Sequence, residues 1–203
     1  RALAIWREEA RGGSEAARRE LANALYNRAF VFVAAGAWDQ PGAGERSADG
    51  RAMLEEALAI YVELEDTTGQ ANVMWGIGGF EIYRDDASAA EPWYRRALEL
   101  HRAAGHRTME AWSLHMLSVT LIALHRIDEA ATTSRHALSH FRDAGDVGGM
   151  TLSFDALAAE SVGQGDPARA GRLWGAARQL ERVSGTGLAS WDETIFERLP
   201  YSP

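Results

Sequence analysis

The chain has 203 residues, of which 46% are hydrophobic and 25% charged, and its net charge is −8. This length allows a sizeable core, the negative charge disfavours non-specific binding to nucleic acid, and no apolar run approaches the ~20 residues of a membrane span. The absence of cysteine excludes disulfides, thiolate metal sites and cysteine nucleophiles. We expect a cytoplasmic protein that contacts neither a membrane nor nucleic acid directly.

The first third of the chain predicts long helices separated by one long loop. Residues 1–11 fit the second helix of a hairpin, and two glycines end it. Ser14 is a suitable N-cap for a long helix that ends before Gly36. Proline, glycine and polar residues over 37–48 predict a loop longer than its counterparts, and a helix follows over 49–67.

The rest of the chain predicts a regular series of shorter helices. Asp166 followed by Pro167 is a helix start signal, and that helix is expected to end near Gly185. A terminal helix over 190–199 is expected to cap the last hairpin. Helical periodicity predicts the remaining helices over 70–84, 88–104, 107–125, 128–144 and 148–163. The predicted hairpins are 14–67, 70–104, 107–144 and 148–184.

Small residues recur at an interval of forty along the chain. Small side chains let two helices approach closely, and a fixed interval of this length indicates stacked helical hairpins. The recurring residues are Ala90, Ala130 and Ala170, then Ala97, Ala137 and Ala177, and also Gly78, Ser118 and Ala158. We therefore predict an all-α protein, a right-handed α-α superhelix that forms a single domain over residues 1–203.

This spacing of large and small residues resembles the tetratricopeptide repeat (TPR) over about residues 14–185. The units have forty residues where the family has about thirty-four, and the family's proline near the end of the second helix is absent. A narrower resemblance covers residues 168–199, where the run ARAGRLWGAARQLERVSGTGL is similar to the closing segment of TPR regions in actinobacterial ATP-binding regulators of the LuxR and AfsR types. It implies the C-terminal, non-catalytic part of a larger transcriptional or signalling regulator.

In TPR proteins the first helices of the hairpins line a concave groove that binds peptides or other ligands. Aromatic side chains in such a groove can anchor apolar groups of a ligand, although some of these rings could equally pack against neighbouring repeats. The family's clamp for a C-terminal carboxylate is not expected, because the chain has no lysine. The resemblance places in the groove Asn23, Tyr26, Phe30, Asn72, Trp75, Tyr83, Trp112, His115 and Asp155.

Catalytic and metal sites are not expected. His136 and His140 have a spacing that can chelate a metal, but no HExxH motif accompanies them, and exposed histidines are the simpler interpretation. The run GIGGF at 76–80 lacks the strand and the spacing of a phosphate-binding loop. No GxSxG or Walker lysine motif is present. The sequence therefore predicts no enzyme activity, no metal and no cofactor.

Two functional hypotheses follow. In the first, a protein or peptide partner, or a small effector, enters the groove and shifts the packing of the hairpins. In the second, the array is a scaffold for self-association, a homodimerising module without a small-molecule ligand.

Overall fold

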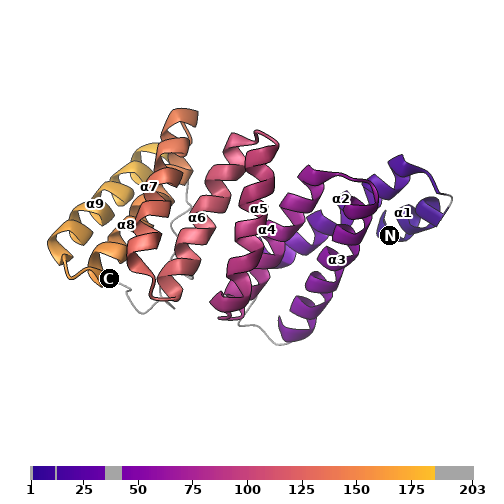
Figure 1. The fold of residues 1–203 in the computed structure, drawn as a ribbon, viewed down its shortest axis with the longest axis horizontal. Coiled ribbons are helices and arrows are strands. Elements are labelled where there is room, and N and C mark those ends of the chain that lie inside the picture. The colour runs from indigo at the N-terminus through magenta and orange to yellow at the C-terminus, as the bar shows by residue number, and fades with distance from the viewer. Residues whose placement is uncertain (1, 12, 35–42, 186–203) are drawn as a thin grey trace. The chain divides into compact units, whose positions relative to one another are not determined.

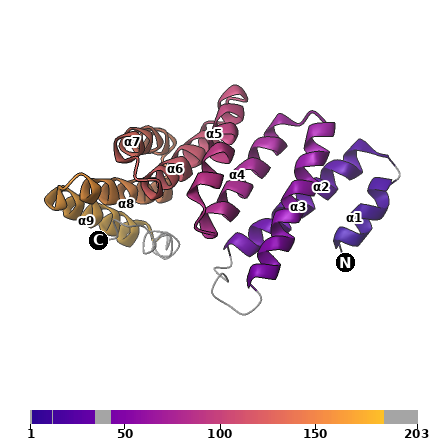
Figure 2. The ribbon, with the colours of Figure 1, turned by 60° about the horizontal axis from the view of Figure 1, so that its bottom comes forward.

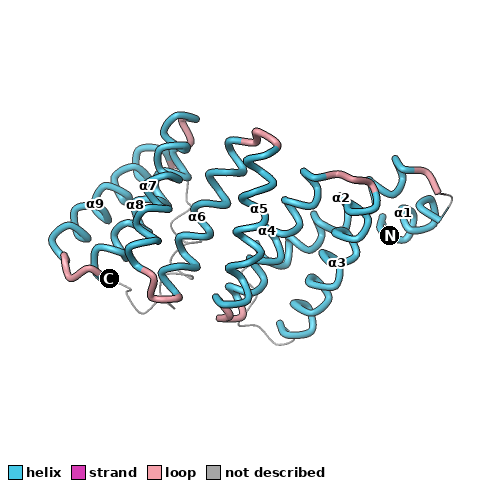
Figure 3. The backbone as a smooth tube through the Cα atoms, in the orientation of Figure 1, coloured by secondary structure: helices cyan, strands magenta, loops and turns pink. Residues whose placement is uncertain are grey.

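The computed structural model describes residues 2–11, 13–34 and 43–185, and this part of the chain is helical without any strand (Figure 1, Figure 3). The prediction of an all-α helical repeat is confirmed. The predicted capping helix over 190–199 lies outside the described residues. The helices are α1 (Ala2–Arg11), α2 (Glu15–Ala34), α3 (Ala43–Glu63), α4 (Thr67–Tyr83), α5 (Ala87–Ala103), α6 (Arg107–Ala123), α7 (Ile127–Ala144), α8 (Val147–Gly163) and α9 (Pro167–Ser184).

The chain divides into two compact units, unit 1 over Arg1–Asp86 and unit 2 over Ala87–Pro203. Within unit 1, α2 packs against α1, α3 and α4. Within unit 2, each helix packs against the next in antiparallel pairs, and α6 also packs against α8 (Figure 2). The predicted hairpin over 70–104 spans the boundary between the units. That pairing stays a prediction, as do the single domain and the hand of the superhelix.

The loops from α3 onward share one backbone conformation. A residue in the left-handed region follows each of these helices at intervals of twenty residues. After the first six of them, the next residue donates its N–H to the carbonyl five positions back, with N···O distances of 2.8–3.0 Å. This pair of features defines the Schellman motif, which satisfies the last carbonyls of a helix. The left-handed residues are Glu65, Asp85, Gly105, His125, Gly145, Gly165 and Gly185. The forty-residue repeat of the sequence therefore consists of two helix-and-loop modules of twenty residues.

Three aspartates cap the helices that begin after these loops. Asp66 accepts a hydrogen bond from the N–H of Gly69 at 2.8 Å, and Asp146 accepts one from Gly149 at 2.9 Å. Asp166 accepts from the N–H of Arg169 at 2.9 Å, with Pro167 as the first helical residue, which confirms the predicted start of α9. Each cap satisfies one of the otherwise unpaired N–H groups of the first turn.

The recurring small residues lie where helices meet. Ala90, Ala97, Ala130, Ala137 and Ala177 have no exposed surface, and Ala170 is 5% exposed. Gly78, Ser118 and Ala158 are buried as well. The forty-residue pattern thus identified core positions correctly.

Three predicted boundaries were wrong, and in one of them the helix expected to begin at residue 70 begins at Thr67. The loop expected over 37–48 was too long, because α3 already begins at Ala43; residues 35–42 lie outside the described part. The helix expected over 49–67 ends at Glu63 instead, because the chain turns at Glu65, whose φ is +52°. Glycine or asparagine usually occupies such a position, so a glutamate gave no signal for the end of the helix. No helix in the described part is long and apolar enough to cross a membrane.

Candidate binding surface

Three of the predicted groove residues form one aromatic cluster in unit 1. Tyr26 and Phe30 lie one turn apart on α2 with ring centroids 6.3 Å apart, and Phe30 stacks on Trp75 of α4 at 6.2 Å and 28°. Phe30 is 37% exposed, whereas Trp75 is 9% exposed. We call Tyr26, Phe30 and Trp75 the aromatic surface of unit 1.

Gly76 on α4 faces side chains of α2 and α3 behind this surface. A Cβ at Gly76 would lie 3.5 Å from the ring of Tyr26 and 3.4 Å from the side chain of Leu54 on α3. These are ordinary van der Waals distances, so Gly76 lies within the packed interface of the three helices behind the aromatic surface.

The two predicted asparagines lie on the same two helices, α2 and α4. Asn23 is half-buried and its Oδ1 accepts a hydrogen bond from the hydroxyl of Tyr61 on α3 at 2.7 Å. Burial, with the nearby carboxylate of Asp66, raises the pKa of Tyr61 to about 12, so this hydroxyl keeps its proton. Asn72 on α4 is also half-buried, and Tyr83 at the end of α4 is buried.

The predicted groove residues of unit 2 have a different environment. Trp112 on α6 meets the edge of Phe141 on α7 at 5.2 Å and 73°, and it meets His115 at 6.2 Å. His115 is 1% exposed, and burial lowers its pKa to about 4, so the imidazole is neutral at pH 7. Asp155 on α8 is 6% exposed and accepts a hydrogen bond from Arg178 on α9 at 2.9 Å. These three residues pack within the unit.

The structure thus brings Tyr26, Phe30 and Trp75 together in unit 1, and Trp112 with His115 in unit 2. Of the nine predicted residues, Phe30 alone is exposed, and the other eight are half-buried or buried. Among the described residues there is no group of three histidine, aspartate or glutamate side chains arranged to hold a metal.

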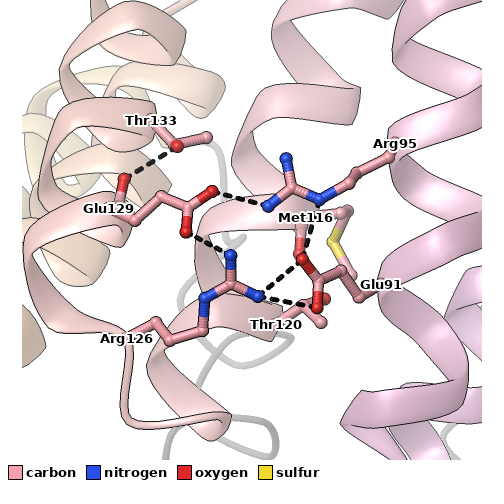
Figure 4. A network of polar contacts seen from close by, with 7 residues as sticks. All are labelled: Glu91, Arg95, Met116, Thr120, Arg126, Glu129 and Thr133. Carbon is pink, nitrogen blue, oxygen red and sulfur yellow. Dashed lines mark hydrogen bonds and ion pairs between the residues drawn. The ribbon is translucent and has the colours of Figure 1, made fainter.

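Sequence reasoning missed a charged network that joins α5 to α7 (Figure 4). Arg126 donates to both carboxylate oxygens of Glu91, at 2.7 and 2.8 Å, and Arg95 donates to Glu91 at 2.7 Å. Arg95 also donates to Glu129 at 2.5 Å, and Arg126 forms an ion pair with the same carboxylate. The available signal was the pairing of Glu91 with Arg95 four residues on, and of Arg126 with Glu129 three residues on.

The network lowers the pKa values of the carboxyl groups of Glu91 and Glu129. Burial alone would raise the pKa of Glu91, but hydrogen bonds from Arg95 and Arg126 outweigh burial, and the pKa is lowered. The hydrogen bond from Arg95 is the main reason that the pKa of Glu129 is lowered. Both groups are therefore ionised at neutral pH, and the network holds two adjacent hairpins together.

Comparisons with known proteins agree with this fold. A sequence model of the family described as tetratricopeptide repeat matches residues 69–143. The crystal structure of BtubC (BKLC) from P. vanneervenii is similar over 91% of this chain and 78% of that chain, with a TM-score of 0.63 and 18% sequence identity. At this identity the similarity shows the fold alone. No curated protein matches the sequence. The chain is therefore a TPR-like helical repeat, a type of fold that typically binds proteins.

Proposed function

We propose that this chain is a non-catalytic recognition domain that binds a protein or peptide segment on the aromatic surface of unit 1. The observation that carries the proposal is the exposure of Phe30. The residue is 37% exposed while its ring stacks on Trp75 and lies beside Tyr26. A ring that is already held in place loses little conformational entropy on binding, and such rings are typical anchors at interfaces.

The chemistry of this surface favours a ligand with an apolar anchor and an extended backbone. The rings offer contact area to an aliphatic or aromatic side chain, and Asn23 and Asn72 place carboxamides on the same two helices. Carboxamides can both donate to and accept from a peptide backbone. A small apolar effector would use the same rings without the need for an extended backbone.

The resemblance over residues 168–199 supports a place for this domain in a larger cytoplasmic transcriptional or signalling regulator. Binding would then be useful as a signal only if the ligand favours one arrangement of the hairpins over another.

The test of the binding surface uses a phage-displayed library of random dodecapeptides. Selected peptides are labelled and titrated by fluorescence polarisation against the wild type, Phe30→Ala and Val62→Ala. Val62 on α3 is a matched control because it is apolar and 53% exposed but takes no part in the aromatic surface. We expect Phe30→Ala to weaken binding by at least tenfold, about 1.4 kcal/mol, and Val62→Ala to leave it unchanged. Selected peptides that bind both variants equally well would refute the proposal.

Self-association is the second candidate, and Trp174 on α9 favours it. This tryptophan is 43% exposed, whereas Ser134, forty residues earlier on α7, is 1% exposed. Gly171 and Gly175 flank it, and a Cβ at either would meet nothing within 4 Å. A second copy could therefore approach the α9 backbone closely. Sedimentation velocity over a concentration series tests this: a dimer that Trp174→Ala dissociates supports it, and a monomer at every concentration excludes it.

A further inference from the structure

The junction between α7 and α8 contains a buried carboxyl group with an incomplete set of hydrogen bonds. Ser134 on α7 donates its hydroxyl to Oε1 of Glu160 on α8 at 2.5 Å, and both residues are 1% exposed. Oε2 of Glu160 is buried and has no hydrogen-bond partner in the described part of the chain. A buried carboxylate normally needs paired charges or several donors. This site therefore suits the neutral acid better than the anion.

The charges around Glu160 do not compensate for its burial. Arg135 on α7 and Arg169 on α9 favour the anion through space, and α6, the third helix that packs on α8, adds no charged group to this pair. Burial is the dominant effect and raises the pKa of Glu160 to about 7. The carboxyl group consequently changes its charge close to neutral pH.

The fold itself does not require an acid at this position. Forty residues earlier, Thr120 occupies the matching place on α6 and donates its hydroxyl to the carbonyl of Met116 at 2.7 Å. Forty residues before that, Phe80 occupies it on α4 and is 1% exposed. Neutral side chains thus serve at the two equivalent positions, and Glu160 brings a property that the packing of the other helices lacks.

We propose that the α7–α8 junction is a proton-operated joint, in which neutral Glu160 keeps the α8–α9 hairpin packed on α7 and loss of its proton favours opening of that junction. Opening gives the carboxylate access to water, so the open state binds the proton less tightly than the closed state. By linkage, a rise in pH shifts the equilibrium toward the open state until Glu160 is ionised in both states. The joint would control the half of unit 2 that carries Asp155, independently of the aromatic surface of unit 1.

Hydrogen exchange of the intact chain, measured by mass spectrometry between pH 5.5 and 8.5 and corrected for the intrinsic pH dependence of exchange, tests this joint. We expect the opening equilibrium for amides of α8 and α9 to rise on the order of thirtyfold across this range, most of it below pH 7.5, from linkage alone. Peptides of α2 in unit 1 serve as the internal reference and should not follow this change. Glu160→Gln, which keeps the shape but cannot ionise, should remove the rise in α8 and α9.

A second measurement keeps the proposal testable if the glutamine variant folds poorly. In wild-type protein labelled with ¹³C at the glutamate carboxyl carbons, one signal should titrate with a midpoint near pH 7. Ser134→Ala removes the donor that favours the anion and should move that midpoint upward. A Glu160 signal that titrates between pH 4 and 5, or a pH dependence of exchange that Glu160→Gln leaves intact, overturns the proposal.

Discussion

The ring of Phe141 on α7 lies against Gly149 on α8, so close that a Cβ on the glycine would overlap the ring. The same relationship holds between Tyr61 and Gly69, eighty residues earlier in the chain. In both cases the aromatic residue precedes the glycine by eight positions and an aspartate caps the helix of the glycine. The interlocking of a ring with a bare helix backbone is thus a repeated means of closing a hairpin junction in this protein.

Gly149→Ala should destabilise unit 2 by about 1–3 kcal/mol, because the added methyl group forces the ring of Phe141 out of place. The gain in helix propensity, about 1 kcal/mol, offsets only part of that loss. Gly171→Ala on α9 is the control, since a Cβ there meets nothing within 4 Å. Urea denaturation should show it unchanged or up to about 1 kcal/mol more stable. Equal effects at both glycines would contradict the packing argument.

The left-handed loops predict opposite effects for two substitutions. Gly105 has φ +69° with open space around it, so Gly105→Ala should cost about 1 kcal/mol from backbone strain alone. His125 occupies the equivalent loop twenty residues on, with φ +59°. Its replacement by glycine relieves strain, and the melting temperature measured by circular dichroism should rise by a few degrees. A lower melting temperature for His125→Gly would show that the histidine makes contacts worth more than the strain.

Unit 2 should reach its highest stability near pH 7. Burial lowers the pKa values of His101 and His115 to about 4, so each contributes stability that is lost as pH falls from 6.5 toward 4. Glu160, with its pKa raised to about 7, contributes stability that is lost as pH rises from 4.5 to 7. Between pH 4.5 and 6.5 the unfolded state binds about one proton more than the folded state, so stability rises by about 2–3 kcal/mol.

Above pH 6.5 the last gain from the two histidines and the last loss from Glu160 nearly cancel, so stability changes little and levels off above pH 7. Urea denaturation at half-unit pH intervals checks this profile. The stability of Glu160→Gln should rise more steeply up to about pH 7 and then level off, because only the two histidines remain. A wild-type profile that keeps rising through pH 8 would mean that Glu160 ionises without cost.

The network of Figure 4 should stabilise unit 2 cooperatively. Glu91→Gln removes the acceptor shared by Arg95 and Arg126. We expect a loss of up to about 1 kcal/mol at low salt, the range of partly exposed ion pairs, and a smaller loss at 1 M salt because of screening. Arg96→Gln is the control, because Arg96 pairs only locally with Glu99 on α5. The same loss at both salt concentrations would indicate a packing effect.

The sequence predicted the repeat well because small residues report close helix contacts directly. Ala90, Ala130 and Ala170 are buried as expected, and Asp166 with Pro167 begins a helix as expected. The end of α3 was missed, because a glutamate adopts the left-handed conformation there. Backbone strain of this kind cannot be predicted from the amino-acid composition of the segment.

The candidate site was harder to predict than the fold, because exposure depends on partners that lie far away in sequence. Trp112 on α6 and Phe30 on α2 were both predicted to line the groove. Trp112 is covered in part by Phe141, twenty-nine residues later, while Phe30 stacks on Trp75 and remains 37% exposed. The periodicity of the sequence predicts the face of the helix on which a ring lies. Only the packed structure decides whether solvent reaches it.

A left-handed residue recurs every twenty positions from Glu65 to Gly185. Because the loops therefore share this backbone conformation, one loop can replace another. An exchange between two loops forty residues apart would insert or delete one whole hairpin, and the chain at the new join would keep the backbone conformation of the old one. Such events would change the length of the array without a new loop having to evolve. Side-chain pairs that occur at one junction only, such as Ser134 with Glu160, then determine which hairpins can pack next to one another.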